Sequence, residues 1–381
     1  MTAGTDLPSP EEGPPGTEGA GAGRSGIRPM ARADIPAVEA IFRTAFARGR
    51  PTGDLAAYIE TVFFGSPHYS EEHGSVVYDS ARDGISSAIL AIPMPFSVHG
   101  RPVMARLLCA FMSHGDKAAL GAARLARSLR AGQVDMCFSD NASPVSADHW
   151  SAVGGIMLPV QSLEWQRAFQ PLGAAVLSAC RGKSVRLLHA AAPLRLVDRM
   201  LLSWKPSLRP QPVPGCTARR ADPTEFLDCA RPMFERFAIH PVWTKESFDW
   251  LAGIAAMNGT LGALDCRIVA DRNGTIGAFL FFGKPGAAAT VMNLVCAEGR
   301  ERDVVGQMFA CLAEEGYALA TGMAQPFMMN AIMRQRRLSF RHRGFFYINS
   351  RHDDLLETAR RGDIYIGGLA SESWSRLVTD F

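Results

Sequence analysis

Three side chains in the first half of the chain, His114, His149 and Asp140, are candidates to accept a proton in a reaction near neutral pH. An imidazole changes its charge in that range, and a carboxylate can act as a general base when it is suitably placed. His114 follows an apolar run, and Asp140 follows a second one. The sequence does not show which of the three would act. A single histidine is more often a surface or partly buried side chain without a chemical role.

The elements that must position these residues begin in the same way twice. Residues 27–38 (IRPMARADIPAV) have the pattern of a basic strand running into an amphipathic helix, and residues 216–227 (CTARRADPTEFL) repeat it. Such internal repetition indicates two copies of one architecture. In the first half, hydrophobic spacing predicts helices at 34–47, 55–64, 118–130 and 143–153, and strands at 75–79, 85–98, 103–112 and 134–138.

The second half has nearly the same order of elements. Its strongest local signal is the Asn273-Gly274 pair, which predicts a hairpin. The pattern predicts helices at 224–236, 244–257, 303–315 and 327–335, and strands at 267–271, 275–282, 289–296, 318–321 and, closing this half, 345–349.

The two openings resemble the first strand and helix of the GCN5-related N-acetyltransferase (GNAT) family. The resemblance implies an α/β (α+β) chain of two tandem GNAT-like domains, each with a mixed, mostly antiparallel central sheet flanked by helices. We expect an N-terminal domain at 26–206, a proline-rich linker at 207–215 and a C-terminal domain at 216–381. Residues 1–25, rich in Pro, Gly, Glu and Thr, are expected to be disordered.

The resemblance also implies a cofactor site in the first half. In the family, the pantetheine arm of acyl-CoA lies between two splayed strands, and its pyrophosphate lies on backbone N–H groups at a helix N-terminus. The residues that the resemblance places there are Ala110, Phe111, Met112, Lys117, Ala118, Ala119, Gly121 and Ala122. The family signature, Arg/Gln-x-x-Gly-x-Gly/Ala, is degenerate because Leu120 stands at a glycine position. A closely packed helix start is the alternative explanation.

The family usually has an asparagine after its fifth strand, and Asn141 matches it. The resemblance therefore adds Asn141 to His149 and Asp140, which are candidates by residue type and by their nearness to the proposed cleft, as the candidate catalytic residues. Trp150 stands where the family often has a tyrosine that protonates the leaving thiolate. An indole N–H cannot act as such an acid, so another residue serves, no acid is needed, or this half is not catalytic.

The second half is the poorer candidate for binding a cofactor. Arg300 and Arg302 could reach phosphates, but the next helix begins near Glu301 and Asp303, which would repel an anion. The tail at 362–374 resembles the ending of GNAT-like proteins from bacterial biosynthetic clusters.

Composition narrows the remaining classes of function. A net charge of +3 over 381 residues gives no basic tract for nucleic acid. The eight cysteines form no Cys-x-x-Cys pair, so we expect reduced thiols and no metal. No apolar run reaches the roughly 18 residues of a membrane helix, so we expect a cytoplasmic protein without membrane contact. We expect it to be a monomer or a homodimer.

The function that the resemblance implies is an N-acyltransferase, most simply one that transfers acetyl from acetyl-CoA to the primary amine of a small molecule. Two alternatives remain open from the sequence. One is a catalytically degenerate binding protein, and the other is an aminoacyl or long-chain acyl transferase with a carrier-bound donor.

Overall fold

The computed structural model of the chain describes residues 25–46, 53–81, 84–115, 118–130, 134–179, 197–198, 200, 204, 209–284 and 286–381. Except for Ser25, the tail predicted to be disordered lies outside these residues. Lys117 also lies outside them.

The first sheet is built around a long antiparallel hairpin, β3 (Gly84–Val98) and β4 (Arg101–Ser113). Its only parallel pair among the described strands joins β4 to β5. The order of the sheet is β1 (Gly26–Pro29), β2 (Val76–Ser80), β3, β4, β5 (Met136–Ala142), β15 (Phe345–Asn349) and β6 (Ile156–Met157), and β9 (Ile239–Pro241) pairs with β3.

The second sheet repeats this plan. Its hairpin is β10 (Ala263–Asp271) and β11 (Gly274–Gly283), which closes at the predicted Asn273-Gly274 turn with Asp271 opposite Gly274. The order is β14 (Leu338–His342), β7 (Leu163–Ala168), β13 (Leu319–Met323), β12 (Ala288–Cys296), β11, β10 and β8 (Thr217–Ala221). Within the second sheet, β12 and β13 are the only parallel neighbours among the described strands. The predicted fold class, two mixed, mostly antiparallel sheets flanked by helices, is confirmed.

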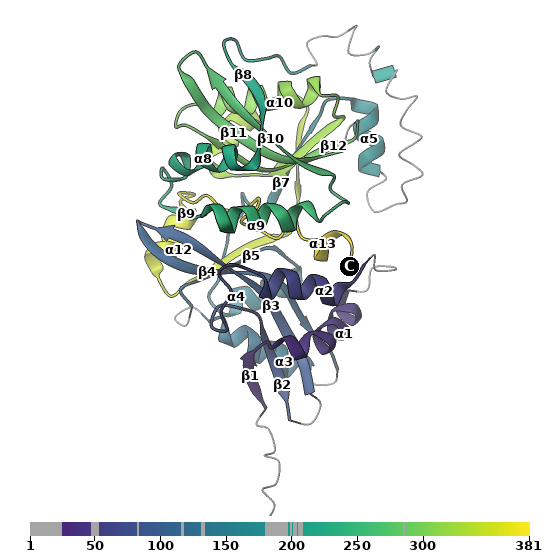
Figure 1. The fold of residues 1–381 in the computed structure, drawn as a ribbon, viewed down its shortest axis with the longest axis vertical. Coiled ribbons are helices and arrows are strands. Elements are labelled where there is room, and N and C mark those ends of the chain that lie inside the picture. The colour runs from purple at the N-terminus through teal and green to yellow at the C-terminus, as the bar shows by residue number, and fades with distance from the viewer. Residues whose placement is uncertain are drawn as a thin grey trace, which may run out of the picture.

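Helices cover both faces of the first sheet, because its central strands carry apolar side chains on both faces. On one face Leu90 and Ile92 pack with the helix α1 (Ile35–Phe46). On the other face Ile89 and Ala91 pack with α3 (Ala118–Ser128) and α4 (Pro144–Ala152). The helix α2 (Leu55–Ile59), which continues as a π-helical turn at Glu60–Phe64, lies beside α1 (Figure 1).

The core under α1 continues without interruption into the second half. The helices α8 (Pro223–Phe234) and α9 (Lys245–Ala256) belong to the same core cluster, and Figure 1 shows α9 lying between the two sheets. The opposite face of the second sheet packs on α10 (Glu301–Glu314). The remaining described helices are α5 (Pro171–Ala179), α11 (Met329–Met333) after the turn Pro326–Met328, α12 (Asp353–Arg360) and α13 (Arg376–Thr379).

Each half of the chain contributes to the other half's sheet: besides β9, which pairs with β3, one strand crosses in each direction. β7, from the first half of the chain, pairs with β13 and β14 in the second sheet. β15, from the second half, lies between β5 and β6 in the first sheet, where Phe346 stacks on Phe138 with ring centroids 6.2 Å apart. The prediction that residues 345–349 close the second half is therefore wrong, since an apolar pattern marks a strand without naming its partner. The domain limits, with a linker at 207–215 between domains at 26–206 and 216–381, remain a prediction. Each sheet contains at least one strand from the other side of this linker.

Candidate active site

The parallel strands at the centre of the first sheet diverge. β4 and β5 pair from Ala105 to Leu107 and from Met136 to Phe138, and the described pairing stops there. On its other side β4 carries a bulge at Cys109, because Leu90 pairs with Ala110 while Ala91 pairs with Leu108. A bulge bends its strand and increases the local twist, which turns the end of β4 away from β5.

A cavity of about 550 Å³ lies where the two strands separate. We call it the fissure cavity. β4 lines it with Cys109, Ala110 and Phe111, and β5 lines it with Ser139 and Asn141. Two strand edges that end their mutual pairing leave backbone groups that an extended ligand can bind as an added strand would.

The fissure cavity passes from one face of the sheet to the other. Leu108 and Trp150, which line it, belong to the core cluster under α3 and α4. Ala110 and Phe42, which also line it, belong to the cluster under α1. A ligand can therefore enter on the side of α3 and α4 and present its end on the side of α1.

The second sheet has the same geometry. β12 and β13 pair from Ala288 to Val291 and from Leu319 to Gly322, and the described pairing stops there. A bulge at Met292 lies next to this point, because Leu280 pairs with Asn293 while Phe281 pairs with Val291.

In this half, however, the chain's own tail occupies part of the space between the diverging strands. Tyr365 Oη donates a hydrogen bond to the carbonyl oxygen of Leu294 at 3.2 Å. Asn293 Nδ2 donates to Tyr365 Oη at 3.1 Å, and Asn293 Oδ1 accepts from the backbone N–H of Leu369 at 2.9 Å. From the β13 side, Gln325 Nε2 donates to the carbonyl oxygen of Ile366.

Two adjacent glycines let the tail backbone lie this close to both strands. Gly368 has a φ of +63°, and a Cβ there would clash with the carbonyl oxygen of Met292. Gly367 has a φ of +113°, and a Cβ there would lie 2.6 Å from Met323 Sδ. The space that remains beside Tyr365 and Gly367 is about 10 Å³, roughly the room for one water. The tail therefore occupies this gap on the side of Tyr365.

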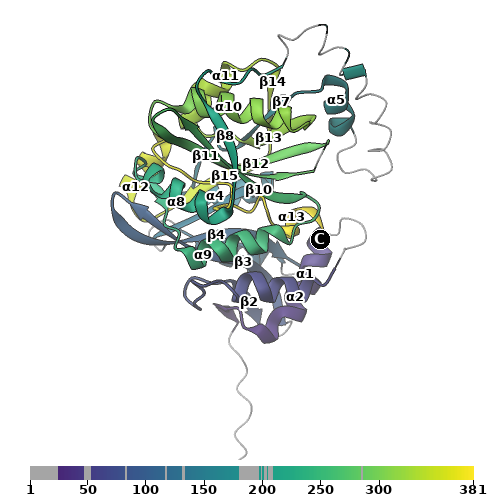
Figure 2. The same cartoon turned by 45° about the horizontal axis from the view of Figure 1, so that its top comes forward.

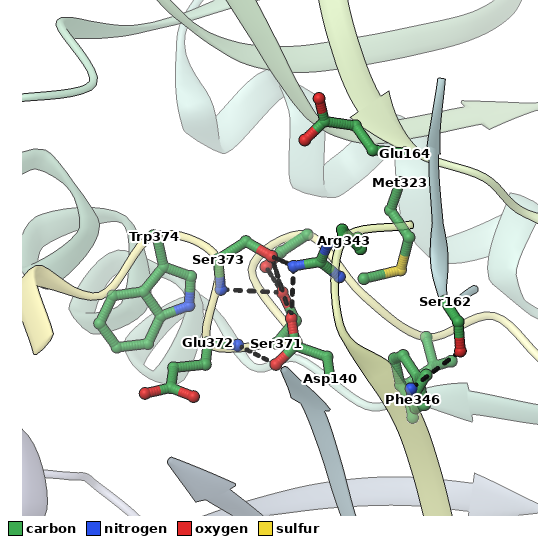
Figure 3. A network of polar contacts seen from close by, with 12 residues as sticks. Asp140, Ser162, Glu164, Met323, Arg343, Phe346, Ser371, Glu372, Ser373 and Trp374 are labelled. Carbon is green, nitrogen blue, oxygen red and sulfur yellow. Dashed lines mark hydrogen bonds and ion pairs between the residues drawn. The ribbon is translucent and has the colours of Figure 1, made fainter. Parts of the chain in front are cut away.

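Beyond residues 365–369, the tail is hydrogen-bonded to Asp140 in the first half of the chain (Figure 3). Asp140 Oδ1 accepts a hydrogen bond from the backbone N–H of Glu372 at 2.8 Å. Asp140 Oδ2 accepts from Arg343 Nη2 at 2.9 Å and from Ser373 Oγ at 3.0 Å. Because Asp140 has no exposed surface and holds three donors, it acts as the anchor of the tail.

Glu372 is carried into the site by this anchor. Its side chain points away from the Asp140–Arg343 cluster in Figure 3, and it lines the fissure cavity while only 4% exposed. Burial, with a further contribution from Asp140, raises the pKa of the Glu372 carboxyl well above its ordinary value, and Arg343 partly opposes this shift. A carboxyl with a raised pKa is suited to accept a proton near neutral pH.

A second cavity of about 320 Å³ meets the first at this carboxyl. We call it the polar cavity. It shares Asn141, Arg343, Glu372 and Val378 with the fissure cavity. Strands of the second sheet provide most of its further polar lining, namely Glu164, Thr290, Thr321 and Arg341, with Ser373 and Thr379 added by the tail. The rest of its lining is apolar and includes Val291, Met292 and Met323, where β12 and β13 separate.

The structure separates the predicted cofactor residues into two groups. Ala110 and Phe111 line the fissure cavity. Met112 is 2% exposed in the core, and Gly121 and Ala122 are buried, with Gly121 so close to Ser87 that no Cβ fits. Ala118 and Ala119 begin α3, as predicted, and the structure does not describe Lys117.

The predicted catalytic residues have different surroundings. Asn141 is exposed and lines both cavities. Asp140 is occupied by the donors described above. His149 lies on α4 with its ring 5.7 Å from that of Phe111, and it is not among the residues that line either cavity. His114 is exposed at the end of β4.

Sequence reasoning missed Glu372, Arg343 and the bulge residue Cys109. Glu372 stands between two serines in an irregular tail, and Arg343 is one of many arginines, so no local pattern marks either of them. In the second half, Arg300 is held by Asp271 at 2.5 Å and by Asp303 at 3.0 Å.

No family model and no curated protein matches the chain. Solved structures do resemble it. A conserved protein of unknown function from Enterococcus faecalis V583, described as a probable N-acyltransferase, has a TM-score of 0.55 and 11% identity over 88% of this chain and 75% of that one. A GCN5-related N-acetyltransferase from Anabaena variabilis has a TM-score of 0.55 and 9% identity over 87% of this chain and 74% of that one. The chain therefore has the tandem GNAT fold.

Within the described ranges, no helix has both the length and the apolar character needed to cross a membrane.

Proposed function

We propose that the protein is an acyltransferase that moves the acyl group of acyl-CoA, or of another pantetheine thioester, to the amine of a small polar molecule. The observation that carries this proposal is the open gap between β4 and β5, with a buried carboxyl at its inner end. In the second sheet, residues 365–369 occupy the corresponding gap on the side of Tyr365, and the space left beside Met292 and Met323 belongs to the polar cavity. This contrast supports the first half as the donor site.

The donor fits the fissure cavity in one direction. Its pantetheine arm would lie along the unpaired edges of β4 and β5, and its phosphates would lie near the N-terminus of α3, where the helix dipole favours an anion. The thioester would then lie at the bulge, beside Cys109 and Ala110. A backbone N–H of β4 in that position can polarise the carbonyl oxygen.

The acceptor would enter through the polar cavity, which brings its amine to Glu372. The amine lone pair attacks the thioester carbonyl carbon, and the C–S bond breaks as the C–N bond forms. The Glu372 carboxylate takes the proton that the amine nitrogen loses, and the departing thiolate is protonated by water. Positioning the two reactants and removing this proton are the contributions that the described residues can make.

A transfer assay tests this function. The protein is mixed with acetyl-CoA and a panel of polar amines (an amino alcohol, an amino sugar and amino acids), and the release of free thiol is followed. We expect release that depends on the amine and that falls at least about 100-fold in Glu372→Gln, the usual size of a lost general base. Glu235→Gln, at an exposed position, is the matched control. Tight CoA binding without transfer to any amine would instead indicate a binding protein.

A further inference from the structure

The inner end of the fissure cavity is a chamber lined by apolar side chains. α1 contributes Phe42 and Phe46, and the end of the chain contributes Leu377, Val378 and Phe381. We call these five side chains the apolar chamber. They lie on the α1 side of the sheet, beyond the point where the thioester would lie.

The walls of the chamber are held in place by packing. The rings of Phe42 and Phe46 lie with centroids 4.9 Å apart. The ring of Phe381 lies 5.5 Å from that of Tyr58, and the Arg376 guanidinium lies 4.9 Å from the Phe381 centroid. Figures 1 and 2 both show α13 and the C-terminus beside the α1 and α2 region. Such a preformed apolar space binds a chain without first having to be ordered.

The two cavities differ in their position relative to the thioester. The polar cavity is lined by threonines, Ser373, Asn141 and the Glu164–Arg341 pair, whose two bonds are each 2.9 Å long, and also by the apolar side chains of Leu261, Val291, Met292, Met323 and Val378. Its hydroxyls and charged pair can orient an acceptor amine. The apolar chamber is part of the same cavity as the fissure, so it receives whatever continues from the thioester carbonyl.

We propose that the apolar chamber binds the acyl chain of the donor, and that the preferred donor is a medium-chain acyl thioester such as octanoyl rather than acetyl. This inference rests on the proposed function and names the class of its donor. An acetyl group would leave the partly exposed side chains of Phe46 and Val378 facing empty or wet space. A longer chain would bury its methylenes against them.

The test is calorimetry of the full-length protein with CoA, acetyl-CoA, butyryl-CoA, hexanoyl-CoA and octanoyl-CoA. Full burial of each methylene corresponds to about fourfold in affinity, or ~0.8 kcal/mol. We therefore expect octanoyl-CoA to bind at least about 100-fold tighter than acetyl-CoA, which requires only partial burial of the six added methylenes.

Octanoyl-pantetheine, in a parallel titration, separates a CoA donor from a carrier-bound one. Equal affinity for the two would indicate a carrier protein, and weaker binding of the pantetheine form would indicate CoA.

Two variants with the same change of size locate the effect. Val378→Phe fills the chamber and should reduce the octanoyl-to-acetyl ratio to below about tenfold, the equivalent of 1.4 kcal/mol. Val242→Phe makes the same substitution at a position that is 43% exposed and lines neither cavity, and it should keep the full ratio. Thermal melting of both variants checks that they fold.

The outcomes separate the two proposals. Affinity that is independent of chain length, with CoA itself bound, would overturn the medium-chain inference and leave the proposed function intact. A chain-length effect that survives in Val378→Phe would also overturn it, because the chain would then lie elsewhere. Failure of CoA and of every thioester to bind would overturn the proposed function itself.

Discussion

The carboxylate of Asp140 accepts a hydrogen bond at 2.8 Å from the backbone N–H of Glu372, a residue 232 positions later in the chain. This bond joins the end of β5, in the first half, to the C-terminal tail. It turns the Glu372 side chain into the space between the two cavities. The general base of the proposed reaction thus depends on a contact between distant parts of the sequence.

Removing the anchor should therefore affect both stability and activity. Asp140→Ala leaves the Arg343 guanidinium without its buried partner, and breaking a buried ion pair in this way costs about 3–5 kcal/mol. Ser373→Ala removes one neutral donor from the same carboxylate and one acceptor from Arg343 and Ser371, but it keeps the ion pair and should cost less, about 2 kcal/mol. Urea unfolding measures both changes. Equal losses in the two variants would contradict the anchoring role of Asp140.

The pH dependence of transfer should report the Glu372 carboxyl. Burial raises the pKa of this group, so at low pH it is protonated and cannot accept the amine proton. The rate should rise as the pH passes through this pKa, above the ordinary value of about 4.3 for a glutamate. In Glu372→Gln the residual rate should lack this rise, while any later rise from ionisation of the acceptor amine should remain. A profile of unchanged shape in the variant would exclude Glu372 as the base.

The fit of the tail into the second sheet can be tested at its glycines. Gly368→Ala requires both a left-handed backbone and a contact with the Met292 carbonyl oxygen. Gly316→Ala, at a φ of +85° with open space around it, requires only the backbone, at a cost of about 1–2 kcal/mol. We expect Gly368→Ala to lower the free energy of unfolding clearly more than Gly316→Ala. A cost no larger than that of the control would mean that the tail does not fill this gap.

The sequence was a good guide to elements that are specified locally. The repeated openings and the Asn273-Gly274 turn predicted the doubled plan and the second hairpin because turn chemistry and hydrophobic spacing act over a few residues. The resemblance also directed attention to Ala110 and Phe111, which line the cavity.

What the sequence could not show depends on contacts between distant residues. The apolar run at 345–349 predicted a strand, but only its pairing with β5 and β6, which are distant in the sequence, shows that it belongs to the first sheet. Likewise, nothing local to Glu372 indicates its burial, because its backbone is held in the interior by Asp140, which lies in the first half of the chain.

The proposed function requires that the gap between β4 and β5, and not the gap between β12 and β13, binds the donor. The most direct measurement is calorimetry of CoA binding to the native protein, to Ser139→Trp and to Arg300→Glu/Arg302→Glu. Ser139 lines the fissure cavity, so a tryptophan there should abolish detectable binding, with thermal melting confirming that the variant is folded. The double arginine variant, altered at the start of α10 in the second half, should bind CoA as the native protein does. Loss of CoA binding in the double arginine variant, with full binding retained in Ser139→Trp, would contradict the placement of the donor between β4 and β5.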